Sequence, residues 1–201
     1  MIRWNNKILL AAIETTYGTD PEPAATDAVL AKDVTLTPME GSDVSREVDL
    51  AYLAAQGTIP TELHAKLAFT VEAAPSGTAG TAPAWGKLLR ACAMAETIVE
   101  DTSVTYNPVT DDHESITLYL YVGDTLFALP GSRGTAKFTW TAQAVPTIEF
   151  EFTGLFVLPV EGSRPTPDTS AWQRPERVAK ATVTACSIDG VSLNARSVAL
   201  T

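Results

Sequence analysis

Hydrophobic and polar residues alternate with a period of two along several stretches of the chain, which is the pattern of strands with one buried face. The first long stretch spans residues 63–71, where leucine, alanine, phenylalanine and valine occupy the odd positions. A shorter strand is predicted over Val34–Thr37, and the irregular, charged residues 39–61 follow it. The pattern therefore predicts a mainly β protein.

The longest alternating region spans residues 115–154 and contains three turn signals. Gly123 and Asp124 are typical of a two-residue hairpin turn, in which glycine supplies the positive φ of the first position. Residues 130–134 and the Val145–Pro146 pair are interpreted as two further turns. Four strands joined in this order predict an antiparallel meander.

The period changes after the loop of small residues at 73–83. Trp85, Leu88, Leu89 and Cys92 fall at i, i+3, i+4 and i+7, the apolar stripe of an amphipathic helix. We expect this to be the one substantial helix and to pack against the sheet. The predicted fold class is therefore mainly β: an antiparallel β-sandwich or half-barrel with one flanking α-helix.

The chain is expected to divide into three parts. Residues 1–160 form the β domain, and residues 161–177, rich in Pro, Ser and Arg, form a linker or arm. In residues 178–201 the segment Ile188–Val191 is a strong hairpin signal. Because the sequence stops at Thr201 within a strand pattern, this last part is expected to begin a truncated C-terminal domain.

Composition and charge narrow the class of function. The 201 residues are 45% hydrophobic and 19% charged, which allows a sizeable core. No apolar run reaches the roughly 20 residues of a membrane helix, and Ile8–Ile13 is too short for the apolar part of a signal peptide. A soluble intracellular product is expected. The net charge of −10 argues against tight binding to phosphate backbones.

Cysteines and histidines are the candidate metal ligands. Cys92 and Cys186 lie far apart in the sequence, and two scattered thiols in an unexported chain are more often reduced than paired. A disulfide between them is the alternative. Neither cysteine lies at ligand spacing from the other, from His64 or from His113. We therefore expect solvated histidines and no metal site.

Candidate catalytic groups are few. Ser132 lies between glycines, but at the wrong spacing for a nucleophile elbow, and turn chemistry explains those glycines. Glu149 and Glu151 share a strand face at about 7 Å, and residues 111–114 form a tighter acidic cluster. Paired carboxylates serve glycosidases, but nothing else in the sequence indicates a sugar cleft. We expect no catalytic residue, no cofactor and no enzyme activity.

Acidic and basic residues separate along the chain. Between Ala91 and Gly123 there is no Lys or Arg, whereas basic residues gather further on. This polarity favours heterologous association, in which one surface meets a different surface of the next copy; two unrelated solvated patches explain it equally well. The acidic set is Glu96, Glu100, Asp101, Asp111, Asp112 and Glu114, and the basic set is Arg164, Arg174, Arg177 and Lys180.

Three stretches of the chain resemble the tail tube proteins of long-tailed bacteriophages, the siphophages. Residues 131–140 carry a Gly-Ser-Arg-Gly turn that starts a strand, and residues 145–155 carry a Pro-Thr turn followed by Phe-Glu-Phe-Thr-Gly. Residues 7–21, with Glu-Thr-Thr-Tyr-Gly-Thr-Asp-Pro, resemble the N-terminal region of the same family. The resemblance covers roughly residues 7–160.

The resemblance implies a structural virion protein with a β-sandwich or half-barrel of the tail tube type. It implies hexameric rings whose sheets join into a continuous barrel, and stacking of the rings through a loop at residues 39–61 and through the N- and C-terminal arms. The implied partners are further copies of the chain and other tail proteins, namely the tape measure, the tail terminator and the baseplate or tip. DNA would pass non-specifically through the lumen, no membrane is involved, and assembly takes place in the bacterial cytoplasm.

A polar sheet face would line the lumen of such a tube, where an acidic wall would keep DNA from sticking. Glu149 and Glu151 are the candidate lumen residues. Two alternatives remain open. One is another ring-forming virion or secretion-tube protein of the same fold. The other is a β-sandwich binding module or hydrolase, which would need a cleft with convergent polar groups.

Overall fold

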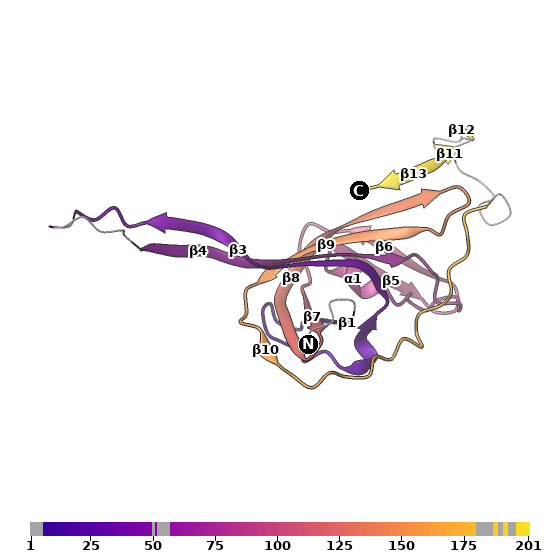
Figure 1. The fold of residues 1–201 in the computed structure, drawn as a ribbon. Helices are drawn as coiled ribbons and strands as arrows, with labels where there is room; N and C mark the ends of the chain where they lie inside the picture. The colour runs from indigo at the N-terminus through magenta and orange to yellow at the C-terminus, as the bar shows by residue number, and fades with distance from the viewer. Residues whose placement is uncertain (1–5, 50, 52–56, 180–186, 189–190, 193–195) are drawn as a thin grey trace.

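The structure is mainly β, with antiparallel sheets and one short α-helix, which confirms the predicted fold class (Figure 1). It is a computed structural model. The residues that it describes are 6–49, 51, 57–179, 187–188, 191–192 and 196–201.

Two antiparallel sheets share one long strand, β8. Sheet A has the order β2–β1–β7–β8–β10, and sheet B has the order β13–β8–β9–β4–β3. The strands of sheet A are β1 (Lys7–Ile13), β2 (Ala28–Val29), β7 (Ile116–Val122), β8 (Thr125–Thr141) and β10 (Val160–Glu161). Those of sheet B, besides β8, are β3 (Ala31–Ser45), β4 (Thr58–Glu72), β9 (Thr147–Leu155) and β13 (Ser197–Leu200).

The continuity of β8 corrects the predicted meander, which has three strands and not four. The hairpin between β7 and β8 is as predicted, with Gly123 at φ +65°. Residues 130–134, interpreted above as a turn, instead lie within β8. The register against β7 shifts there, from Ile116 opposite Ser132 to Leu118 opposite Leu129. Pro130 and Gly131 therefore form a bulge that bends the strand from one sheet into the other.

The core lies between the two sheets. Alternate residues of β4 and β9 point into it, and they include the fully buried Leu67 and Phe152. The aromatic rings of Phe69, Phe150 and Phe152 stack there with centroids 5.7–5.9 Å apart. The same cluster takes in Leu118 and Leu120 from sheet A. The alternation that predicted these strands is therefore the core of the sandwich.

The predicted helix is short. α1 spans Gly86–Arg90 and buries Leu88 and Leu89 in the core, so the expected packing is confirmed, although Trp85 and Cys92 lie just outside it. After α1 the chain forms a separate hairpin of β5 (Met94–Val99) and β6 (Ser103–Pro108).

A long hairpin of β3 and β4 projects beyond the sandwich (Figure 1). We call its outer part, residues 39–45 and 58–61, the arm. The sequence had suggested an irregular segment here, but Met39–Ser45 is strand. Alternation fails because bulges interrupt the pairing and because neither face of the arm is covered: Met39, Val44 and Ile59 are each more than half exposed.

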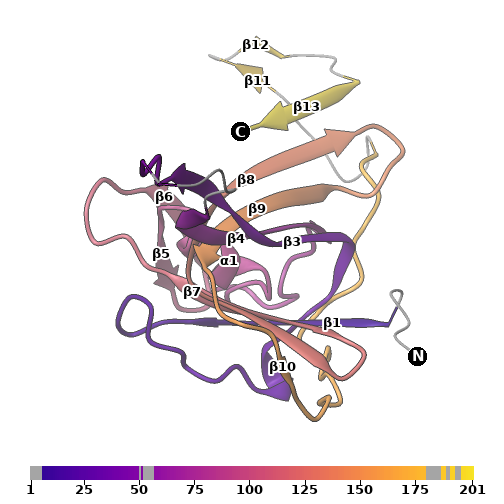
Figure 2. The same ribbon diagram turned by 60° about the vertical axis from the view of Figure 1, so that its left-hand side comes forward.

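The segment after β10, residues 162–178, which we call the strap, crosses the outer face of sheet A (Figures 1 and 2). The backbone N–H of Gly162 donates to the carbonyl of Asp124 at 2.9 Å. Further on, the N–H of Asp168 donates to the carbonyl of Ala25, also at 2.9 Å. Beneath the strap lies a second apolar cluster of sheet A, formed by Ile8, Leu10, Ala28 and Tyr121.

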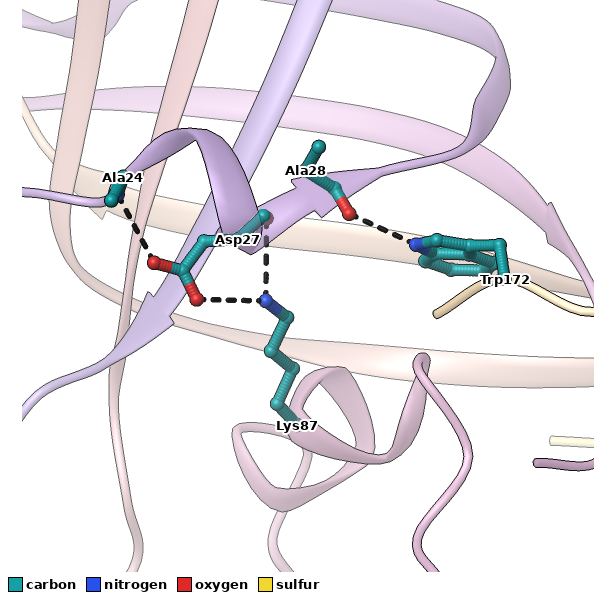
Figure 3. A network of polar contacts seen from close by, with 5 residues as sticks. All are labelled: Ala24, Asp27, Ala28, Lys87 and Trp172. Atoms are coloured by element: carbon teal, nitrogen blue, oxygen red, sulfur yellow. Dashed lines mark hydrogen bonds and ion pairs between the residues drawn. The ribbon is translucent and has the colours of Figure 1, made fainter. Parts of the chain in front are cut away.

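A polar clamp fixes the strap near β2 (Figure 3). The indole N–H of Trp172 donates to the carbonyl of Ala28 at 2.9 Å. The ammonium of Lys87 donates to the backbone oxygen of Asp27 at 3.2 Å and to its carboxylate at 3.3 Å. Burial lowers the pKa of Lys87, an effect that the Asp27 carboxylate opposes. The short 3-10 helix η1 (Ala25–Asp27) is thereby tied to both α1 and the strap.

Beyond the strap, β11 (Ser187–Ile188) pairs with β12 (Val191–Ser192), and Ile188 lies opposite Val191 as the hairpin signal predicted. The turn residues 189–190 lie outside the described part of the chain. The division into domains, including a truncated last domain, stays a prediction.

Replacing Gly134 with alanine should destabilise the fold. A Cβ atom at this position would lie 2.4 Å from the carbonyl oxygen of Glu151 and 2.6 Å from the ring of Phe152. Both atoms belong to the packed core strand β9, so we expect Gly134→Ala to lower the free energy of unfolding by about 1 to 3 kcal/mol. Urea unfolding measures this. The control is Gly57→Ala, where a Cβ would meet nothing within 4 Å and stability should hardly change.

Candidate functional site

Two of the stretches that carry the family resemblance meet in space. The segment that follows β1, beginning with Glu14, lies against the bulge of β8 at Gly131, 117 residues further along the chain. Their contact is made by one buried carboxylate.

Glu14 is only 6% exposed, and both of its carboxylate oxygens are fully engaged. Oε1 accepts hydrogen bonds from the Thr117 hydroxyl at 2.5 Å and from the Gly131 backbone N–H at 2.6 Å. Oε2 accepts from the Ser115 hydroxyl at 2.6 Å and from the Gly18 backbone N–H at 2.8 Å. Each oxygen therefore binds one hydroxyl and one backbone donor.

These donors set the ionisation of the side chain. Burial by itself would raise the pKa of Glu14, but the four hydrogen bonds together outweigh it and hold the pKa below its ordinary value of 4.5. Glu14 is thus a carboxylate at neutral pH. It joins the end of β1, the start of β7 and the bend of β8.

Above this carboxylate the two stretches also touch through their side chains. The guanidinium of Arg133 lies 5.1 Å from the centroid of the Tyr17 ring, in a cation–π contact. Gly131 has a φ of +62°, and a Cβ there would lie 3.1 Å from Tyr17 and 3.3 Å from Leu155. The positive φ and the close approach of these side chains both favour glycine here. Tyr17 and Leu155 remain 56% and 42% exposed, so the junction ends in a small apolar surface.

The outer face of sheet B is polar and open. Side chains that alternate with the core residues of β3, β4, β8 and β9 point outward from it. Lys137 pairs with Glu149 at 3.0 Å, and Lys66 pairs with Glu40 at 2.8 Å. The expected acidic wall is not what this face presents, because its charges nearly balance. Its charged residues include Lys32, Lys66, Arg133, Lys137, Glu40, Glu72, Glu149 and Glu151, together with His64.

Of the candidate metal ligands, the structure describes His64, Cys92 and His113, and it does not bring these three together. His64 lies on the polar face of sheet B, 3.7 Å from Glu40, and exposed His113 contacts the carbonyl of Val109 at 3.1 Å. Cys92 is half-buried with a free thiol, and burial raises its pKa to about 12. Cys186 lies outside the described residues. Within the described part of the chain, no three His, Cys, Asp or Glu side chains are grouped to hold a metal.

Ser132 and the acidic cluster are also engaged elsewhere. Ser132 is fully buried, and its hydroxyl donates to the carbonyl of Leu129 at 2.8 Å. A hollow of about 480 Å³ beside β5 is lined by Asp111, Asp112 and Glu114, among others. Glu114 there forms a two-pronged pair with Arg90, both hydrogen bonds being 2.6 Å. Two of the charged groups that line this hollow, Arg90 and Glu114, are thus bound to each other.

The separated charges lie on different parts of the surface. The acidic set follows the β5–β6 hairpin and the loop after it, and Arg164, Arg174 and Arg177 lie on the strap. Lys180 lies outside the described residues. No helix of the described chain is both long and apolar enough to cross a membrane.

A family model described as "Phage tail tube protein" matches residues 4–201. The search of curated proteins finds no match to the chain.

Replacing Glu14 with glutamine should destabilise the fold. A glutamine has one oxygen in place of two, and either orientation of its amide turns an NH₂ group toward a backbone N–H, of Gly131 or of Gly18. A hydroxyl could rotate to accept, but a backbone donor cannot. We expect Glu14→Gln to lower the free energy of unfolding at pH 7 by about 2 to 3 kcal/mol, measured by urea unfolding.

The same variant tests the pH dependence. Because the pKa of Glu14 is lowered on folding, its ionisation stabilises the native state above the ordinary value of 4.5, and that contribution is lost as the pH falls through the folded pKa. The Glu14→Gln variant should therefore lose less stability than the wild type between pH 5 and more acidic conditions. Glu149→Gln, on the exposed face, is the matched control. Equal acid sensitivity of Glu14→Gln and wild type would refute the assigned role.

Proposed function

Because the chain belongs to the phage tail tube protein family, and is thus a structural component of the virion tail, we propose how it builds the tube. Copies join into hexameric rings, the rings stack, and the lumen conducts DNA during delivery. The observation that carries this proposal is sheet B, which has one face in the core, one polar face open to solvent, and β3 as an edge strand.

An edge strand presents unpaired backbone groups that favour pairing with another chain. A ring closes such edges when the sheet of each copy continues into the sheet of the next, as in other closed barrels. The apolar face of sheet B is covered by its own sandwich, and the strap covers the outer face of sheet A. The polar face of sheet B is the one that suits a water-filled lumen.

The arm is suited to contacts between rings. It projects beyond the sandwich, and Val44 and Ile59 face each other across it, each 52% exposed (Figure 1). Burying such a pair against another subunit would release apolar surface from water. We assign stacking to the arm, within the predicted segment 39–61, and expect residues 46–57 to take part.

The remaining parts of the proposal concern the other partners. At its two ends a tube needs proteins that start, measure and stop it, so we propose contacts with the tape measure, the tail terminator and the baseplate or tip. Assembly is proposed to take place in the cytoplasm of the bacterial host. No enzymatic step is needed for any of these roles.

Electron microscopy of the concentrated protein is the direct test of assembly. We expect stacked rings with an axial hole, and we expect Val44→Asp to abolish stacking because a charge would be buried between rings. The matched control is Ser45→Asp, which introduces the same charge at the next residue, on the opposite face of the strand. Stacking of Val44→Asp tubes as in wild type would contradict the role of the arm.

The lumen assignment is tested by reversing charges. The double variant Glu149→Lys, Glu151→Lys changes the nearly balanced polar face of sheet B into a basic one, which should retain DNA through counterion release. We expect normal tubes that bind DNA in co-sedimentation, with binding lost at high salt, and reduced DNA delivery by the virion. Glu100→Lys, Asp101→Lys on the β5–β6 hairpin is the control with equal charge change. Normal delivery by the first variant would count against these lumen residues.

A further inference from the structure

The second edge of sheet B belongs to β8, and it is occupied by a segment of the same chain. On one side, Arg133–Thr139 of β8 pairs with β9. On the other side, β13 pairs with β8 along four residues, from Ser197 opposite Thr141 to Leu200 opposite Phe138. Near the start of this edge, the Gly134 N–H also donates to the carbonyl of Ala91, at 3.2 Å.

The packing of β13 against β8 is incomplete. Leu200 is 58% exposed, so the strand buries little apolar surface. Thr139, which lies opposite Ala199, has its hydroxyl buried without a hydrogen-bond partner in the described structure. A buried hydroxyl without a partner costs free energy that a better-matched neighbour would recover. The edge is covered, but by a short and imperfect strand.

β13 runs in the direction that strand β3 of a neighbouring copy would have if the two copies shared one continuous sheet. Each step from β8 to β9, from β9 to β4 and from β4 to β3 is antiparallel, so β3 runs opposite to β8. If a second copy is placed beside the first so that its sheet B continues the same sheet, its β3 meets β8 antiparallel. β13 is also antiparallel to β8, and it thus holds the position that this β3 would take.

The side chains of the two edges also match. Thr35 and Thr37 of β3 lie on the polar face, as do Thr135 and Thr139 of β8. Junction of these edges would set threonines beside threonines, a favourable cross-strand pairing, and would give Thr139 hydroxyl partners. On the other face Leu36 would approach Phe138. A joined sheet keeps one polar and one apolar face without a break.

We propose that the β8 edge is the contact surface for the β3 edge of a second copy, and that β13 is an intramolecular placeholder which the second copy displaces. The inference rests on the proposed ring, and it adds how the free chain is kept from pairing early. Joining β8 of one copy to β3 of the next uses two different edges, so the contact repeats until the ring closes.

A disulfide lock tests the displacement. The Ala142 N–H donates to the Arg196 carbonyl at 2.9 Å, so by antiparallel alternation Thr139 and Ala199 form a non-hydrogen-bonded pair, with Cα atoms close enough for a disulfide. Thr139→Cys with Ala199→Cys is made in a Cys92→Ala, Cys186→Ala background. We expect loss of rings and tubes when oxidised and their return on reduction. The single variant Thr139→Cys, treated alike, should assemble under both conditions.

The opposite variant frees the edge. Val198 forms a hydrogen-bonded pair with Trp140 by the same alternation, and Val198→Pro removes its N–H donor. We expect faster hydrogen exchange of the Phe138 and Trp140 amides, whose N–H groups point to β13, in the monomer, and assembly at a lower protein concentration than for wild type. Val198→Ala is the matched control.

Two outcomes overturn the proposal. One is assembly of the oxidised double-cysteine chain as complete as that of the reduced chain. The other is a folded Val198→Pro chain that no longer assembles, since β13 itself would then carry the contact. Failure of the ring proposal is distinct, because the reduced background chain would stay monomeric at every concentration. In that case the Val198→Pro variant tests the role of β13 by itself. Sedimentation should detect dimers of this variant, and a strictly monomeric variant would overturn the proposal that β13 blocks the β8 edge.

Discussion

The fold depends on one buried carboxylate. Glu14 binds the backbone of the β8 bulge and the loop after β1 at once. Without it the buried N–H of Gly131 and the partly buried N–H of Gly18 would lose their partner. A bend in the middle of a strand is costly because it interrupts the ladder of hydrogen bonds. Glu14 replaces the missing bond at Gly131, so β8 can leave sheet A and enter sheet B without exposing its backbone to the core.

The sharing of β8 has consequences at both of its ends. Its first half is flanked by β7 and β10, and its second half by β9 and β13. Each half therefore has one long, stable neighbour and one short neighbour from the last third of the chain. The short neighbours are where the sandwich can change partners without loss of its core, because neither contributes a side chain to the main apolar cluster.

The sequence predicted the strands wherever one face is buried and the other is wet. This holds for β4 and β9, because burial of one face imposes a period of two. β7 was predicted because its aliphatic residues alternate with threonine and tyrosine, although both of its faces are buried, and the hairpin at Gly123 was predicted from its turn residues. It failed at residues 130–134, since a proline and a glycine with positive φ suit a bulge as well as a turn. It also failed along Met39–Ser45, where neither face is buried and no alternation is needed. The central role of Glu14 was missed because its donors at 115, 117 and 131 are distant in sequence; a lone acid after an apolar strand, before Tyr-Gly, was the available signal.

The position of the strap explains which sheet remains free for assembly. Sheet A has apolar side chains on both faces, and its outer cluster, including Tyr121, needs a cover. The strap provides it, held by the Trp172 indole, and a covered face can neither line a lumen nor join another sheet. Sheet B needs no such cover because its outer face carries lysine–glutamate pairs and threonines.

The lysine–glutamate pairs leave the outer face of sheet B almost neutral, so most of the net charge of −10 lies elsewhere on the subunit. If this face lines the lumen, as proposed, its lysine–glutamate pairs neither attract nor strongly repel a polyanion, and the paired lysines are less able to bind phosphate. Low adhesion of DNA to such a lumen would then follow from the pairing of charges more than from their excess.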